Sequence, residues 1–64
     1  MMNGGDKLKT KDLIDLLEKN GFQFKRHGGD HDVYVRGKER ECVVRHRETD
    51  EELARAIIKR RGLR

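Results

Sequence analysis

The sequence of 64 residues contains no proline, no tryptophan, one cysteine and only three aromatic residues of the Phe and Tyr type. A single cysteine excludes an intramolecular disulfide, so the chain lacks the cross-links with which small secreted domains offset a thin core. This favours a reducing compartment, the cytoplasm. No apolar run approaches the ~18 residues of a membrane helix, and residues 1–6 lack the apolar segment of a signal peptide. We therefore expect neither secretion nor a membrane partner.

Charged residues are abundant instead. They make up 44% of the chain, against roughly 25% in an average soluble protein, which leaves material for only a thin core. The net charge of +4 favours a polyanion or an acidic protein as partner. Residues 53–64 contain five cations and no acid, so we expect a partner at this end of the chain. Residues 1–7 are predicted to be a flexible N-terminus, and residues 8–64 a single domain.

Two segments have the apolar spacing of amphipathic helices. The first is predicted to begin with Thr10 as its N-cap and to end at the left-handed stop Asn20-Gly21. Residues 49–52 fit a capping box, in which Thr49 opens a second helix that Gly62 ends.

Between these helices, apolar and polar residues alternate as in half-buried strands. The predicted strands, separated by short turns, cover residues 22–26, 31–36 and 40–45. The resulting order, α-β-β-β-α, predicts an α+β fold: a three-stranded antiparallel sheet with both helices on one face. The other face would be open to solvent, and function is expected there.

Alternation also sorts the residues of the middle strand between the two faces. Val33 and Val35 indicate that the odd-numbered residues face the core. His31 then lies at the edge of the core, unless the preceding glycine turn directs it outward; alternation alone leaves both orientations open. Cys42 is expected to be a small core residue.

Several residues around the predicted sheet can carry chemistry. His31 is either a turn histidine bound to the backbone or a general acid or base, since imidazole titrates close to neutral pH. The neighbouring glycines allow a ligand to approach the backbone, and Lys25, Arg26 and Arg45 can hold phosphates. Tyr34 can either stack on a base or pack in the core.

Residues 27–32 also contain two histidines and two aspartates, which are ordinary zinc or manganese ligands. If His31 lies in a strand, Asp30 and Asp32 project from the opposite face, and only His27 remains as a co-ligand. We therefore predict no metal site and no cofactor.

Four segments, in this order and spacing, are similar to those of one known family. Residues 11–22 resemble a first helix that runs into a glycine and an aromatic residue; residues 29–34 are similar to a Gly-Ser-His segment followed by an aliphatic and an aromatic residue. Residues 43–46 are similar to Val-Pro-Arg-His, and residues 56–63 to a closing helix. The stretch from Thr10 to Leu63 thus resembles the HicA family of bacterial toxins, the mRNA interferases of type II toxin–antitoxin modules.

This resemblance implies the fold of a double-stranded-RNA-binding domain, with His31 as catalytic histidine and Gly29 beside it. It also implies ribosome-independent RNA cleavage and inhibition by a HicB-type antitoxin that covers the histidine. Asp30 and Val44 replace the family's usual serine and proline. The aspartate places a carboxylate next to His31, where it favours the imidazolium or repels phosphate.

We therefore predict a metal-independent endoribonuclease in which His31 moves a proton during attack of a ribose 2′-hydroxyl on mRNA. The second proton transfer is left to His46, Tyr34 or water. The predicted RNA-binding residues are Gly29, Lys25, Arg26, Arg45 and His46. One alternative is a non-catalytic RNA-binding module of the same fold. Another is a docking protein whose basic last helix, with Arg60 and Arg61, is seated on an acidic antitoxin.

Overall fold

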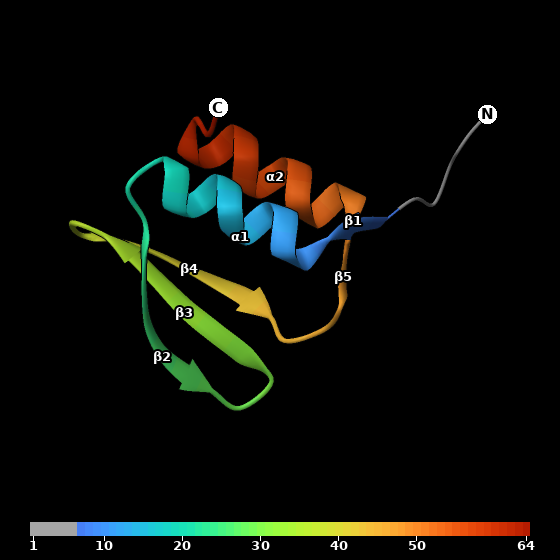
Figure 1. Cartoon of the computed structure of the whole chain (residues 1–64). Helices are drawn as coiled ribbons and strands as arrows, with labels where there is room; N and C mark the ends of the chain where they lie inside the picture. Colours follow the sequence, from blue (N-terminus) through green and yellow to red (C-terminus); the bar gives the residue numbers. More distant parts are fainter. Residues whose placement is uncertain (1–6) are drawn as a thin grey trace.

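Two helices cover one face of a three-stranded antiparallel sheet in the computed structural model of the chain, which describes residues 7–64 (Figure 1). The elements in chain order are β1 (Lys7–Lys9), α1 (Thr10–Lys19), β2 (Gln23–Gly28), β3 (His31–Arg36), β4 (Glu39–Val44), β5 (Glu48–Asp50) and α2 (Glu51–Arg61). The predicted α+β fold is confirmed. Of the predicted N-terminal segment, residues 1–6 lie outside the described residues, and Lys7 begins β1.

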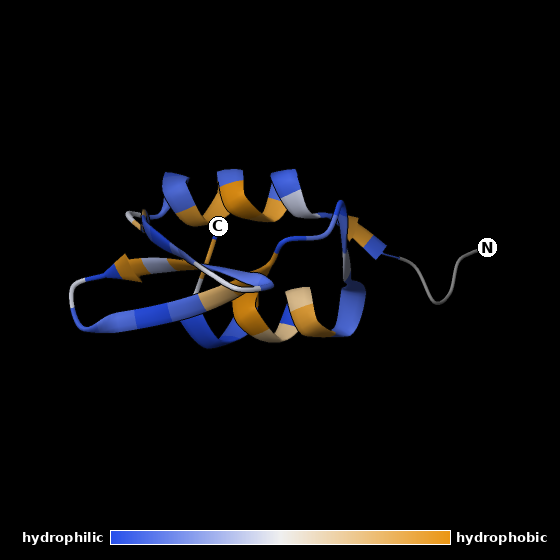
Figure 2. Ribbon diagram, turned by 90° about the horizontal axis from the view of Figure 1, so that it is seen from below, coloured by the Kyte–Doolittle hydropathy of each residue, from blue (hydrophilic) through white to orange (hydrophobic). Residues whose placement is uncertain are grey.

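Each helix contributes an apolar strip to a single core. Leu13 and Leu17 of α1 are fully buried, as are Ala54 and Ile57 of α2. Figure 2 shows the hydrophobic residues of the two helices on the sides that face each other. Gly62, in the left-handed conformation, ends α2 as predicted. Further buried side chains complete the core: Phe22, Tyr34, Val43 and Leu63.

A short two-stranded ribbon, which the sequence did not predict, leads into both helices. β1 pairs antiparallel with β5, and Leu8 lies opposite Thr49. The hydroxyl oxygens of Thr10 and Thr49 form a buried hydrogen bond of 2.7 Å, and neither side chain caps a helix. The N-cap residues are Lys9 and Asp50. Both predicted threonine caps were wrong, because the ribbon brings the two hydroxyls together.

Replacing Thr49 by valine should lower the free energy of unfolding by about 1–3 kcal/mol, because the Thr10 hydroxyl is left buried without its partner. Thr10→Val should have a similar effect. The double variant should lose less than the sum of the two, since it removes both hydroxyls. Urea denaturation followed by circular dichroism measures all four proteins. Strictly additive losses would contradict an energetic coupling of the two hydroxyls.

The register of the sheet turns β3 over relative to the predicted orientation. Tyr34 faces the helices and is only 5% exposed. His31, Val33 and Val35 therefore lie on the other face, which we call the open face. Cys42 pairs with Val33 on this face and is exposed. Val33 is buried as predicted, at 4% exposed, but it lies outside the core cluster that contains Tyr34. The predictions that the odd-numbered residues face this core and that Cys42 is buried were wrong. A tyrosine ring has more apolar area to bury than a valine, so the side of Tyr34 decides the core.

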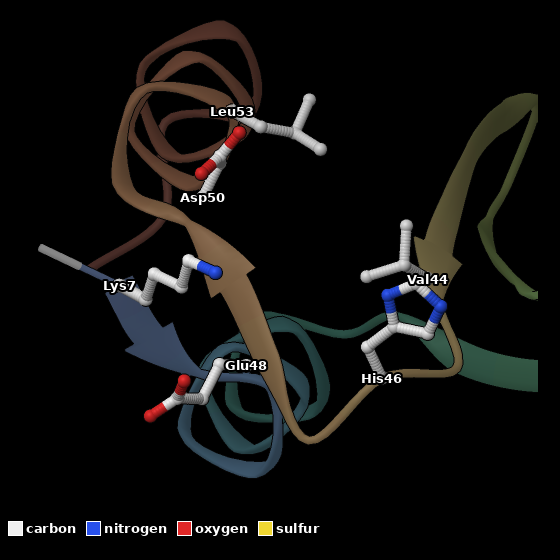
Figure 3. A pocket seen from close by; sticks show the side chains of 6 residues that line it. All are labelled: Lys7, Val44, His46, Glu48, Asp50 and Leu53. Carbon is white, nitrogen blue, oxygen red and sulfur yellow. The ribbon is translucent and has the colours of Figure 1, made fainter. Parts of the chain in front are cut away.

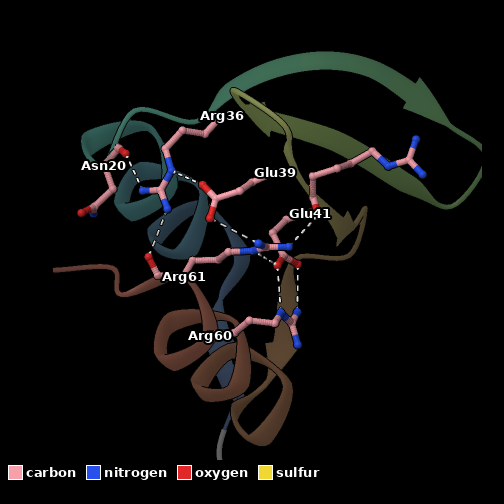
Figure 4. Close-up of polar contacts among 7 residues, drawn as sticks. Asn20, Arg36, Glu39, Glu41, Arg60 and Arg61 are labelled. Carbon is pink, nitrogen blue, oxygen red and sulfur yellow. Dashed lines mark hydrogen bonds and ion pairs between the residues drawn. The ribbon is translucent and has the colours of Figure 1, made fainter.

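The basic end of α2 is bound to the sheet by a buried carboxylate, Glu41, which is 5% exposed (Figure 4). Arg60 donates two hydrogen bonds to it, of 3.1 and 3.0 Å, and Arg61 donates a third. Burial raises the pKa of Glu41, but the bonds from the two arginines outweigh this and hold the pKa below its ordinary value. Both arginines thus attach α2 to the sheet, and their predicted contact with an acidic partner stays a prediction.

Arg36 joins the adjoining part of the sheet to both helices. Arg36 donates hydrogen bonds to Glu39 at 2.6 Å and to the carbonyl oxygens of Asn20 at 2.9 Å and Arg61 at 3.2 Å (Figure 4). Its guanidinium also lies 4.5 Å from the centre of the Phe22 ring. The hydrogen bond from Arg36 lowers the pKa of Glu39. Ion pairs and hydrogen bonds thus hold this end of the sheet against the helices. We therefore look for a functional site at the opposite end of the sheet.

Candidate functional site

All three histidines of the chain lie at one end of the sheet, around the turn formed by Gly29 and Asp30. His27 and His31 stand on the two strands that the turn joins, and His46 follows the end of β4. The backbone N–H of Arg45 donates a 2.8 Å hydrogen bond to the carbonyl oxygen of Asp30, which holds the end of β4 against the turn. Figure 1 shows this turn at the end of the β2–β3 hairpin that points away from the helices.

His31 and Arg26 lie on the same face of the sheet, the open face. His31 starts β3 opposite Gly28 and Val44, and it is exposed. Arg26 pairs with Val33 and therefore shares its face. The Nη1 atom of Arg26 lies 3.3 Å from the position that a Cβ on Gly28 would occupy. The guanidinium thus reaches over Gly28, the residue of β2 that pairs with His31.

A β-bulge in β2 creates this arrangement. Phe24 lies opposite Tyr34, and the next paired residue of β2 is Arg26, so Lys25 is the extra residue. The bulge shifts the alternation by one position, which sends Arg26 to the open face and His27 to the helix side. Bulges are frequent beside active sites, where they redirect side chains. Lys25 is exposed in the bulge and does not line the pockets described below.

On the helix side of the same strands, His27, Asp32 and Arg45 form a row. The Nδ1 atom of His27 lies 2.7 Å from Oδ1 of Asp32, and Nε of Arg45 lies 3.5 Å from the same oxygen. The Asp32 side chain is 19% exposed, whereas that of His27 is 62% exposed. Arg45 therefore lies on the opposite side of the sheet from His31. The sequence predicted for His27 only the role of a metal co-ligand with His31. It did not predict the bulge, which places the two histidines on opposite faces of the sheet.

Gly29, Asp30, Arg45 and His46 line an open pocket of about 250 Å³. It is smaller than the roughly 300–1,000 Å³ of typical small-molecule sites. Gly29 has a φ of +63°, and a Cβ added there would meet nothing within 4 Å, so its backbone is uncovered. Three of the predicted RNA-binding residues thus share one hollow, which suits a surface ligand better than an enclosed one.

A second pocket lies between the end of β4 and the start of α2 (Figure 3). His46 and Val44 line it from the β4 side and Leu53 from α2, together with Lys7, Glu48 and Asp50. His46 lines both pockets and connects them.

Tyr34 is removed from the candidate site by its burial. Its ring packs in the core, so of the two predicted roles the packing role holds. Burial, together with the carboxylates of Glu18 and Asp32, raises the pKa of its hydroxyl. A buried phenol with a raised pKa is a poor proton donor to a surface substrate, which leaves His46 and water from the predicted set.

Two further observations concern the described residues only. Within residues 7–64, no three side chains of His, Cys, Asp or Glu gather as a metal site would require. Over the same range, neither helix has the length and apolar character needed to cross a membrane.

The fold and this histidine-bearing sheet end define a small α+β domain that presents its functional groups on an exposed surface. A protein-family model, described as HicA toxin of bacterial toxin-antitoxin, matches residues 10–63. Because the match covers nearly the whole chain, the protein belongs to the HicA toxin family, which implies an antitoxin partner. Searches of curated proteins and of solved structures gave no significant match.

Proposed function

We propose that the protein is the toxin of a type II toxin–antitoxin system and acts in the cytoplasm as an mRNA interferase. In this proposal it is a metal-independent endoribonuclease with His31 as the catalytic residue, and a HicB-type antitoxin neutralises it. Family membership supports this proposal. The observation that carries it is that the exposed His31 and Arg26 share one face of the sheet, and that the neighbouring turn leaves the backbone of Gly29 uncovered.

The reaction needs one proton removed and one supplied. His31 accepts the proton of a ribose 2′-hydroxyl while the oxygen attacks the adjacent phosphorus. The bond from phosphorus to the 5′-oxygen breaks, a 2′,3′-cyclic phosphate forms, and the departing oxygen takes a proton from His46 or from water. Arg26 stabilises the charge that develops on the phosphate oxygens. Lys25 and Arg45 hold flanking phosphates, and Gly29 lets the RNA backbone approach.

The shape of the site supports a polymeric substrate. Both pockets are small, and the candidate residues are spread over the two faces of one sheet end. A domain this thin gains little affinity from enclosure, so binding must be distributed along an extended ligand. Single-stranded RNA provides both phosphates and bases for such contacts.

The purified protein should cleave a transcript equally well with and without EDTA. The products should carry 2′,3′-cyclic phosphate and 5′-hydroxyl ends, which end-specific ligation and mass spectrometry detect. Loss of cleavage in EDTA, restored by a divalent ion, would refute metal independence. If the protein binds the transcript but leaves it intact, the proposal of an enzyme fails and the non-catalytic RNA-binding module takes its place.

A further inference from the structure

We infer that Phe24 and His27 form a stacking platform for one base of a single-stranded RNA, on the helix side of the β2–β3 hairpin. The inference rests on the proposed function for the class of ligand, but it concerns a different surface from His31. No part of the reaction above uses these two rings.

Phe24 is exposed to a degree that its size does not favour. Its exposed fraction is 46%, and within residues 7–64 only Leu53 is a comparably exposed large apolar side chain. The buried core includes Tyr34 but not Phe24 among the described residues. The Tyr34 ring contacts Phe24 edge-on, with 5.7 Å between the ring centres. One side of the Phe24 ring therefore packs against the core residue Tyr34, and the rest of the ring is open to solvent.

His27 extends this surface. Its ring centre lies 5.0 Å from that of Phe24, at an interplanar angle of 59°. The imidazole is held in place, because Asp32 binds its Nδ1 atom and Arg45 approaches the same carboxylate oxygen. An oriented ring loses little conformational freedom when a base stacks on it, so binding costs less. The bulge at Lys25 is what brings the two rings to the same face.

The charges near the platform favour a nucleic acid over an apolar partner. Arg45, whose side chain is 49% exposed, stands beside Asp32 and lines the pocket next to the uncovered backbone of Gly29. A base on Phe24 and His27 would place its neighbouring phosphates within reach of this cation. Every base has a π-face, so a stacking platform of this kind binds RNA with little sequence preference.

Replacing Phe24 by leucine keeps the apolar contact with Tyr34 but removes the ring. It should weaken the binding of a fluorescein-labelled, 2′-O-methylated RNA about 5- to 150-fold, the range for loss of one stacked base. The 2′-O-methyl groups prevent cleavage by the 2′-oxygen, and fluorescence anisotropy gives the Kd. Phe24→Tyr should restore binding. Gln23→Ala, a neutral change at an exposed residue on the opposite face of the same strand, serves as the matched control and should leave the Kd unchanged.

A strand with single abasic residues at successive positions tests stacking directly. At the contacted position, the abasic RNA should bind the wild type more weakly, and it should bind Phe24→Leu and wild type equally. The inference is overturned if Phe24→Leu binds like the wild type, if Phe24→Tyr fails to restore binding, or if every abasic strand remains sensitive to Phe24→Leu. Circular dichroism checks that each variant is folded. Cleavage by a His31 variant is measured separately. The stacking platform can therefore be refuted while the catalytic role of His31 stands, and the reverse.

Discussion

RNA cleavage should fall about 10²- to 10⁴-fold when His31 is replaced by alanine, the range for loss of a general acid or base. The proposed reaction depends on this imidazole to take the proton of the 2′-hydroxyl, and water at neutral pH is a much weaker base. Single-turnover rates, with the protein in excess over a labelled transcript, report the chemical step. RNA retention on a filter should persist, because Arg26, Arg45 and the rest of the surface are unchanged.

A structural cause for such a loss can be separated from a chemical one. His31 is exposed, so its alanine variant should unfold at nearly the wild-type temperature. Lys38→Ala is the matched control, because Lys38 is an exposed residue in the turn at the far end of the β3–β4 hairpin. Equal cleavage by His31→Ala and the wild type would remove His31 from the reaction. Loss of cleavage and retention together would instead make it a binding residue.

The sequence predicted those parts of the fold that depend on local patterns. Leu13 and Leu17 recur at helical spacing, and both proved to be fully buried. Gly62 has the left-handed conformation that ends a helix, and this preference is a property of the residue itself. Such features require no knowledge of what lies across the core.

The wrong predictions depend on contacts between distant residues. Thr10 and Thr49 are good N-caps by type, but their separation of 39 positions conceals the hydrogen bond between them. The bulge at Lys25 is equally hidden, since it exists only relative to the partner strand. The same is true of the site. Gly29, Arg45 and His46 were predicted as RNA contacts, yet only the paired structure shows that Arg45 turns toward Asp32 and away from the face of His31.

Glu41→Gln should destabilise the fold by about 2–3 kcal/mol, somewhat less than the ~3–5 of a fully buried ion pair, because Arg60 remains half exposed. The variant removes one of the two carboxylates that pair with Arg61, whose side chain is 20% exposed. A domain of this length has a total stability of only about 3–10 kcal/mol. The midpoint of thermal unfolding should therefore fall by roughly 10–20 °C. Glu51→Gln is the matched control: its pair with Arg55 is a surface pair, worth below about 1 kcal/mol.

The pH dependence of stability distinguishes a charged Glu41 from a merely polar one. Burial raises its pKa, but the hydrogen bonds from Arg60 and Arg61 prevail, and the folded-state pKa lies below the ordinary 4.5. A carboxyl group whose pKa is lowered by folding stabilises the fold above its unfolded pKa, and this contribution is lost as the pH falls through the folded pKa. Wild-type stability should thus decline below about pH 4.5, and the decline should be smaller in Glu41→Gln, which has no such proton to bind. Parallel declines in the two proteins, measured by urea denaturation between pH 3 and pH 7, would show that Glu41 does not carry this charge. The attachment of Arg61 to the sheet would then rest on its other partners, the carboxylate of Glu39 and the carbonyl oxygen of Arg40.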